Sequence, residues 1–135
     1  MTNKHSQSFF GQKTALIVQS NLKSEPFAYL TCIEKKADGS WEKFSQGEGK
    51  TIKISLEEIV MMLEVLRRKL PIWSTLHEYK GEKTQISLNW EEQKDQILWI
   101  KIGKYSKMMT ISQIEIFKLL LEHLLKEKIK HGTSY

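Results

Sequence analysis

The side chains in this sequence that could do chemistry are mainly basic and aromatic. The chain has 135 residues, with 21 Lys and Arg against 16 Asp and Glu, and a net charge of +5. A positive balance of this kind favours a polyanionic partner. Lysines that follow phosphates, interleaved with Tyr and Trp that can stack on unpaired bases, suit single-stranded nucleic acid, because a duplex exposes no base faces.

Residues for catalysis are scarce. The two aspartates, Asp38 and Asp95, both stand in turn-like sequence, so the carboxylate cluster with which nucleases hold divalent metal is not predicted. No phosphate-binding glycine motif or G-x-S-x-G elbow occurs. The histidines, which show no paired metal-ligand spacing, are His5, His77, His123 and His131. We therefore expect no enzymatic activity, no metal and no cofactor.

Cys32 is the single cysteine, so an intrachain disulfide is impossible, which is typical of a reducing compartment. The sequence shows neither a signal-like N-terminal segment nor a run of about 18 apolar residues. We expect a soluble cytoplasmic protein without membrane contact, associated with the nucleoid in a prokaryote or nuclear in a eukaryote.

An internal repeat determines the expected architecture. Residues 9–36 match residues 79–106 at a constant offset of 70. Aligned pairs include Phe9 with Tyr79, Gly11 with Gly81, Lys13 with Lys83, Leu16 with Ile86 and Tyr29 with Trp99. From Lys50 onward the offset becomes 57, as though 13 residues were missing from the second copy. The repeat predicts two strand-rich units, each ending in a helix and related by a pseudo-twofold axis.

Local patterns place the elements of each unit. Period-two alternation and an Asp38-Gly39 turn predict strands over residues 13–19, 27–35, 40–45 and 50–54. Capping boxes then predict two helices, residues 56–70 after Ser55 with Glu58, and residues 113–130 after Ser112 with Glu115. In the second unit the third strand is either absent or formed by a shorter connection around residues 103–106.

The predicted fold class is α+β, with curved antiparallel sheets packed on paired helices. A hydrophobic content of 40% in 135 residues supplies one core, so we expect one domain over residues 9–130. Its repeats cover residues 9–70 and 76–130. Residues 1–8 are expected to form a disordered N-terminal tail, and residues 131–135 a C-terminal tail.

A family resemblance follows from this order of elements. Two strands, the Asp38-Gly39 turn, a third strand, a glycine-containing loop and the basic segment 50–58 leading into a helix resemble the transcriptional positive cofactor four, Pur-alpha and Whirly families. The resemblance is best over residues 27–66, and the repeat extends it to about residue 130. It implies a curved four-stranded antiparallel sheet packed on a helix, used in pairs, and single-stranded DNA binding in transcription regulation, replication or repair.

Alternation assigns one face of each sheet to the core. The residues expected there are Leu16, Val18, Leu30, Cys32, Ile52, Ile54, Ile86, Leu88, Leu98, Ile100, Ile102, Met109 and Ile111. The opposite face and the Asp-Gly hairpin supply the candidate nucleic-acid-binding residues, which are Lys13, Tyr29, Thr31, Lys35, Trp41, Lys53, Lys83, Gln85, Ser87, Asn89, Trp99 and Lys101.

Each candidate also has a structural interpretation. The aromatic side chains can instead cover neighbouring strands or fill a dimer contact, and the lysines can be ordinary surface charges. Trp41 and Phe44 form either a clamp for bases or a lid over the end of the sheet.

Three functions remain open: a largely sequence-tolerant single-stranded DNA binder, an RNA binder that uses the same face, or a non-enzymatic homo-oligomeric adaptor. The apolar arc of the helix at residues 113–130 is wide enough for a homodimer contact or for packing on the connector at residues 71–76, so a dimer and a monomer both stay open.

Overall fold

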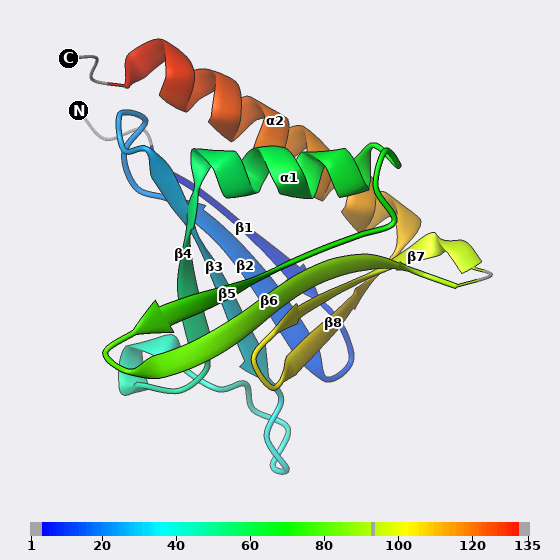
Figure 1. Ribbon diagram of the computed structural model, residues 1–135. Helices are drawn as coiled ribbons and strands as arrows, with labels where there is room; N and C mark the ends of the chain where they lie inside the picture. Colours follow the sequence, from blue (N-terminus) through cyan, green and yellow to red (C-terminus); the bar gives the residue numbers. More distant parts are fainter. Residues whose placement is uncertain (1–3, 93, 133–135) are drawn as a thin grey trace.

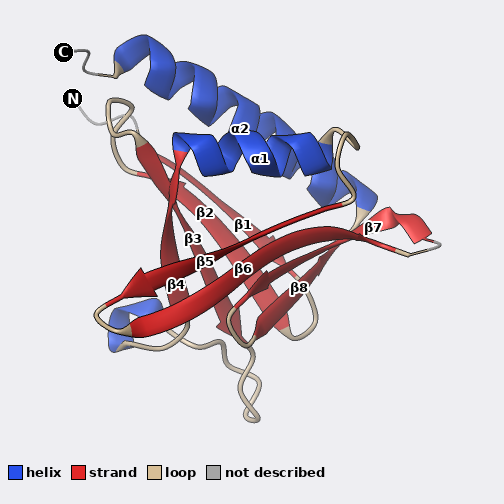
Figure 2. Cartoon of the chain, in the orientation of Figure 1, coloured by secondary structure: helices blue, strands red, loops and turns tan. Residues whose placement is uncertain are grey.

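The computed structural model describes residues 4–92 and 94–132, which form two four-stranded antiparallel sheets, each followed by an α-helix (Figures 1 and 2). The predicted α+β class and the repeated strand-rich unit are confirmed. The elements are β1 His5–Phe10, β2 Thr14–Ser20, β3 Phe27–Glu34, the 3₁₀ turn η1 Phe44–Gln46, β4 Lys50–Ser55, α1 Leu56–Leu66, β5 Ile72–Tyr79, β6 Glu82–Glu91, β7 Lys94–Ile102, β8 Tyr105–Met109 and α2 Ile111–His131.

Both sheets are simple meanders, with strand orders β1-β2-β3-β4 and β5-β6-β7-β8. Register places side chains of like character opposite each other. In the first sheet Leu16 lies across from Cys32, and at the equivalent place in the second sheet Ile86 lies across from Ile102. Because paired residues share a face, the apolar residues of each repeat collect on one side of their sheet.

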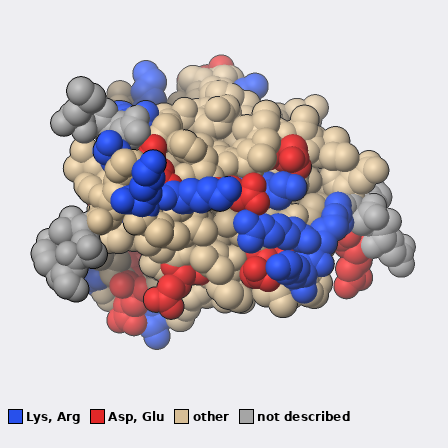
Figure 3. All heavy atoms as spheres, turned by 90° about the horizontal axis from the view of Figure 1, so that it is seen from above, with Lys and Arg blue, Asp and Glu red and all other residues tan. Residues whose placement is uncertain are grey.

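One hydrophobic core joins both sheets and both helices. The helices lie side by side over one end of the pair of sheets (Figure 1), and each repeat sends its apolar helix face into this shared core. The Trp90 indole of β6 donates to the Val65 carbonyl of α1 at 2.7 Å, which ties the second sheet to the helix of the first repeat. Seen from the helix side, basic and acidic side chains are intermixed, with broad uncharged areas between them (Figure 3).

The edge strands β1 and β5 depart from the sequence prediction. Residues 5–8, expected in a disordered tail, belong to β1, and residues 72–75, expected in the connector between the repeats, belong to β5. An edge strand has one neighbour and one partly solvated face, so its sequence carries little apolar alternation. In β1 the buried apolar residue is Phe9, whose ring meets Phe117 of α2 at 5.8 Å.

The predicted third strand at residues 40–45 is wrong. The Asp38-Gly39 turn is confirmed, with an Asp38 carboxylate oxygen accepting from the Ser40 amide at 2.9 Å. After that turn, however, the chain makes a single bridge between Lys35 and Trp41 and then η1. The reason is that β4 already occupies the free edge of β3, so the returning segment has no strand to pair with. This connection, residues 36–49, is hereafter the long loop.

The second repeat is shifted by two residues from its predicted alignment. Ser55 caps α1 with the predicted capping box to Glu58, whereas α2 is capped by Thr110, whose amide donates to the Gln113 side chain at 3.5 Å. The two caps are 55 residues apart rather than the expected 57, so the Ser112 capping box is wrong. A slip of two keeps every strand side chain on its face and is therefore invisible to a period-two pattern.

This shift explains two departures in the core. Ile111, expected inside, is the first residue of α2 and is 63% exposed. Lys107 takes the place opposite Ile100 that Ile52 takes opposite Leu30 in the first sheet, and it is buried. The other residues expected in the core are all buried. The difference between offsets of 70 and 55 means that the paired residues Ile100 and Lys107 are 15 residues closer in sequence than the equivalent pair Leu30 and Ile52. The β7–β8 connection closes as a tight turn at Gly103.

The C-terminal boundary also differs from the prediction, because α2 continues to His131, the first residue of the expected tail. Residues 133–135 of that tail, like residues 1–3 of the N-terminal one, lie outside the described residues. None of the helices in the described segments is long and apolar enough to cross a membrane.

Candidate nucleic-acid interface

The outer face of the first sheet carries an aromatic and basic cluster. Tyr29 of β3 pairs with Gln19 on one side and Lys53 on the other, so all three share this face. The Lys53 ammonium lies 4.3 Å from the ring centroid of Phe27, and the Phe27 and Tyr29 rings meet edge to face at 5.5 Å. Phe27 is not among the predicted binding residues, although its alternation with Tyr29 on β3 is visible in the sequence.

A hollow of about 310 Å³ adjoins this cluster, and we call it the Phe44 hollow. Phe44 reaches over the outer face from the long loop, and Tyr29 and Thr51 are among the lining residues. Thr31 forms part of the hollow but is itself buried, and its hydroxyl shares a 2.7 Å hydrogen bond with the Thr51 hydroxyl. Thr31 therefore supports the β3–β4 pairing and is not available to a ligand. The aromatic side chains that line the hollow are Tyr29 and Phe44.

The larger β4–β5 cleft lies between the adjacent edge strands of the two sheets and has a volume of about 690 Å³. Tyr29 and Lys53 line it from the first sheet and Tyr79 from the second. Its charge is mixed, because Glu78 and Glu82 also line it. A 2.5 Å ion pair between Lys50 and Glu82 crosses it and connects the sheets. Because these carboxylates repel phosphate, the cleft is less suited to nucleic acid than its aromatic side chains alone would indicate.

On the second sheet, the predicted residues form two rows of the outer face. Asn89 and Trp99 are directly paired, as are Ser87 and Lys101. Trp99 is half-buried and has Met108 as its neighbour on β8. The remaining predicted residues of this sheet, Lys83 and Gln85, are exposed on β6. The outer faces of the two sheets point away from a common core, so the predicted residues form two surfaces that meet at the junctions between the sheets.

At one junction, residues predicted from different repeats come together in the Trp99 hollow, which has a volume of about 540 Å³. Its lining residues are Phe10, Gly11, Gln12, Lys13, Thr14, Trp99, Ser106, Lys107, Met108, Thr110 and Gln113. Within the described parts of the chain, no Asp or Glu is among them. The volume lies within the range of about 300 to 1,000 Å³ that is usual for small-molecule sites. An indole, two lysines and several hydrogen-bonding side chains suit a nucleotide.

Lys107 adds a second positive charge beneath this hollow. Its ammonium donates to the Gln113 side chain at 3.1 Å and to the carbonyl of Met108. Burial lowers the pKa of Lys107 from its usual range. Gln113 donates in turn to the Phe10 carbonyl at 2.9 Å, so the floor of the hollow is held by contacts between β1, β8 and α2. The sequence prediction did not include Lys107, because alternation with Met109 assigns it to the core face rather than the outer face.

Lys35 and Trp41 lie outside these hollows. The Lys35 ammonium is 5.5 Å from the Trp41 ring centroid, and the Trp41 ring meets Phe10 at 5.4 Å. Trp41 therefore contacts β1 from the long loop.

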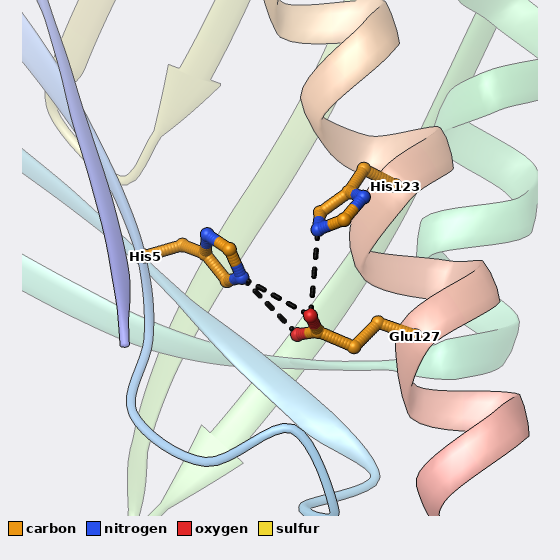
Figure 4. A group of neighbouring side chains, drawn as sticks. All are labelled: His5, His123 and Glu127. Carbon is orange, nitrogen blue, oxygen red and sulfur yellow. Dashed lines mark hydrogen bonds and ion pairs between the residues drawn. The ribbon is translucent and has the colours of Figure 1, made fainter. Parts of the chain in front are cut away.

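The structure also assembles a group that the histidine spacing alone did not indicate. Imidazole nitrogens of His5 and His123 and a carboxylate oxygen of Glu127 lie within 4.8 Å of one another (Figure 4). The available signal was the one-turn spacing of His123 and Glu127 on a single helix face. His5 could not be assigned to the group from sequence, since its strand was not predicted. The other histidine beside a glutamate, His77, bonds Glu58 at 2.5 Å and links β5 to α1.

Two antiparallel four-stranded sheets, each leading into a helix and sharing one core, define the Whirly-like fold. Among solved structures, this chain is similar to a chain from the crystal structures of MRP1/MRP2 of Trypanosoma bruciei, with a TM-score of 0.68. The match covers 96% of this chain and 87% of that chain at 8% sequence identity, so the similarity lies in the fold. No protein-family model matches the sequence, and no curated protein sequence matches it significantly.

Proposed function

We propose that this protein binds single-stranded nucleic acid and that the Trp99 hollow takes one of its nucleotides. The observation that carries the proposal is the meeting of Lys13 and Trp99, from different repeats, in a hollow without acidic lining among the described residues. A base stacks on the Trp99 indole while Lys13 neutralises a neighbouring phosphate. The net charge of +5 supports the same class of ligand.

The strand continues over the outer faces of the sheets. Lys83 and Lys101 are exposed on the second sheet, and Lys53 is exposed on the first beside the Tyr29 ring. Stacking on aromatic rings and neutralisation of phosphates read no base edges, so the binding is largely sequence-tolerant. The MRP1/MRP2 match supports the proposal only through the shared fold.

Single-stranded DNA is the first candidate, acting in transcription regulation, replication or repair, and RNA is the alternative. Stacking and phosphate contacts do not distinguish the two sugars. The test is fluorescence anisotropy with labelled single-stranded DNA, single-stranded RNA and duplex DNA of equal length at two salt concentrations. Single strands should bind more tightly than duplex, with an affinity that falls as salt rises. Equal binding of duplex, or no binding of any of the three, contradicts the proposal.

We also propose self-association through α2. Its apolar residues Ile114, Phe117, Leu121 and Leu124 are buried in the core, while Ile116 and Leu119 are 47% and 54% exposed on neighbouring turns. Val60 and Met61 of α1 are exposed as well. Light scattering coupled to size exclusion should show a dimer for the parent and a monomer for the Leu119→Lys variant. A monomeric parent removes the adaptor alternative and leaves nucleic-acid binding untouched.

A further inference from the structure

The cluster of His5, His123 and Glu127 joins the N-terminal strand to the last turns of α2 (Figure 4). His123 and Glu127 lie one helical turn apart on α2, and His5 points toward them from β1. The imidazole rings of His5 and His123 have their centroids 5.0 Å apart and stand nearly perpendicular. Phe10, at the other end of β1, lines the Trp99 hollow, so the cluster and the proposed nucleotide site occupy opposite ends of one strand.

The two nitrogen–oxygen separations fit a tetrahedral metal ion. Glu127 Oε2 lies 3.3 Å from His5 Nε2 and 3.4 Å from His123 Nε2, and all three ligand atoms lie within 4.8 Å of one another. Zn²⁺ with metal–ligand bonds of about 2.0 to 2.1 Å separates its ligand atoms by about 3.3 to 3.4 Å. A charge-assisted N–H···O⁻ bond is shorter, at about 2.7 to 2.9 Å. The directly hydrogen-bonded His77–Glu58 pair of the same protein is also shorter, with 2.5 Å between His77 Nε2 and Glu58 Oε2.

The charge of the cluster favours a cation. The Glu127 side chain is only 8% exposed, so its carboxylate attracts a cation with little screening by solvent. The buried Lys128 ammonium, which donates to the Leu22 carbonyl at 3.0 Å, also interacts electrostatically with Glu127. Metal coordination uses an unprotonated imidazole nitrogen from each histidine and the ionised carboxylate, and one divalent ion between the three side chains can engage all of them.

We propose that His5, His123 and Glu127 bind one Zn²⁺. Two imidazole nitrogens and one carboxylate oxygen are a ligand set that zinc accepts, with a fourth position left for water. His123 is 55% exposed, so ions can enter from solvent. The bound ion links β1, an edge strand paired only with β2, to the C-terminal half of α2. Zinc thus stabilises β1, whose residues 5–8 were not predicted to form a strand.

The test titrates Zn²⁺ into the full, tag-free chain by isothermal calorimetry after removal of metal with a chelator. One ion per chain is expected. Loss of a ligand costs at least the 10- to 100-fold in affinity that loss of an outer-shell partner costs, so His123→Ala should weaken binding by more than about tenfold. The matched control is His77→Ala, which removes the imidazole of the other His–Glu pair and should leave the affinity unchanged.

Two further readouts separate coordination from folding. Co²⁺ in place of Zn²⁺ should give the visible absorption of a tetrahedral site in the parent and in His77→Ala but not in His123→Ala. Zn²⁺ should raise the melting temperature of the parent and not that of His123→Ala. Because His123 is exposed, this variant keeps the fold, which far-UV circular dichroism verifies. Absence of Zn²⁺ binding in the parent, or equal affinity in the parent and His123→Ala, overturns the proposal.

Discussion

Lys13 and Trp99 belong to different repeats and line the same hollow. Lys13 lies in the β1–β2 turn of the first repeat, whereas Trp99 lies in the middle of β7 in the second. The first repeat supplies Phe10 and the exposed Lys13, and the second supplies Trp99 and the buried Lys107. The pairing of the repeats in one chain therefore completes the candidate site.

Replacement of Trp99 tests the stacking surface. Trp99→Ala should weaken single-strand binding by about 1 to 3 kcal/mol, the usual value of one stacked base. Added oligonucleotide should also quench the fluorescence of Trp99. The measurement is a titration followed by tryptophan emission, with Trp99→Phe as background because Trp41, Trp73 and Trp90 emit as well. An unchanged quench in Trp99→Phe, with normal binding by the alanine variant, would show that Trp99 serves packing only.

The salt dependence of binding tests the lysines. Changing Lys13, Lys53, Lys83 and Lys101 together to Gln should weaken single-strand binding and reduce its logarithmic salt slope by about 0.7 for each lysine that contacts a phosphate. The matched control changes four lysines outside the sheets, Lys69, Lys118, Lys126 and Lys130, and so removes the same net charge. Equal effects of the two sets would mean that net charge, rather than the sheet surface, governs affinity.

The two helix caps provide a stability test of the corrected register. Ser55→Ala removes a hydroxyl that accepts from the Glu58 amide and should lower the free energy of unfolding by about 1 kcal/mol. Ser112→Ala should have little effect, because Ser112 is exposed inside α2 and Thr110 is the cap. Urea denaturation measures both. A loss at Ser112 as large as that at Ser55 would restore the offset of 57.

The thiol of Cys32 should be unreactive in the folded protein. Burial raises the pKa of Cys32 to about 12, which leaves a thiolate fraction of about 10⁻⁴ at pH 8. A disulfide reagent that follows thiol release by absorbance should react with Cys32 only as fast as the protein unfolds. Reaction should become rapid in concentrated denaturant. Rapid labelling of the native protein would place Cys32 outside the core.

Elements buried on one face were predictable from the sequence. β2, β3, β6 and β7 carry apolar residues at every second position, and Leu16 with Val18 or Ile86 with Leu88 identify the core face without further information. The Ser55 cap was equally readable, because a hydroxyl and a carboxylate at this spacing satisfy each other's backbone donors. The side of the sheet on which Tyr29 and Trp99 lie followed from the same alternation.

Features that depend on distant partners were not readable. The polar residues 5–8 form a strand because their backbone pairs with the edge of β2. Their side chains carry no pattern that indicates this pairing. The segment 40–45 has a strand-like composition, but β4 already pairs with the edge of β3, so the segment forms no strand there. The meeting of Lys13 with Trp99, and of His5 with Glu127, depends on how the two repeats dock, which local periodicity does not encode.

The long loop has a consequence for how this fold can diversify. The second sheet makes the same β-strand connection with a tight turn at Gly103, so the framework does not need the additional residues. Those residues nevertheless carry Phe44 to the outer face of the first sheet. Phe44 is 59% exposed, so substitution there changes the surface offered to a ligand with little effect on the core, whereas Glu42 and Trp41 of the same loop contact Tyr105 and Phe10. The two repeats therefore share one strand framework, and the first carries an additional recognition surface at one exposed residue.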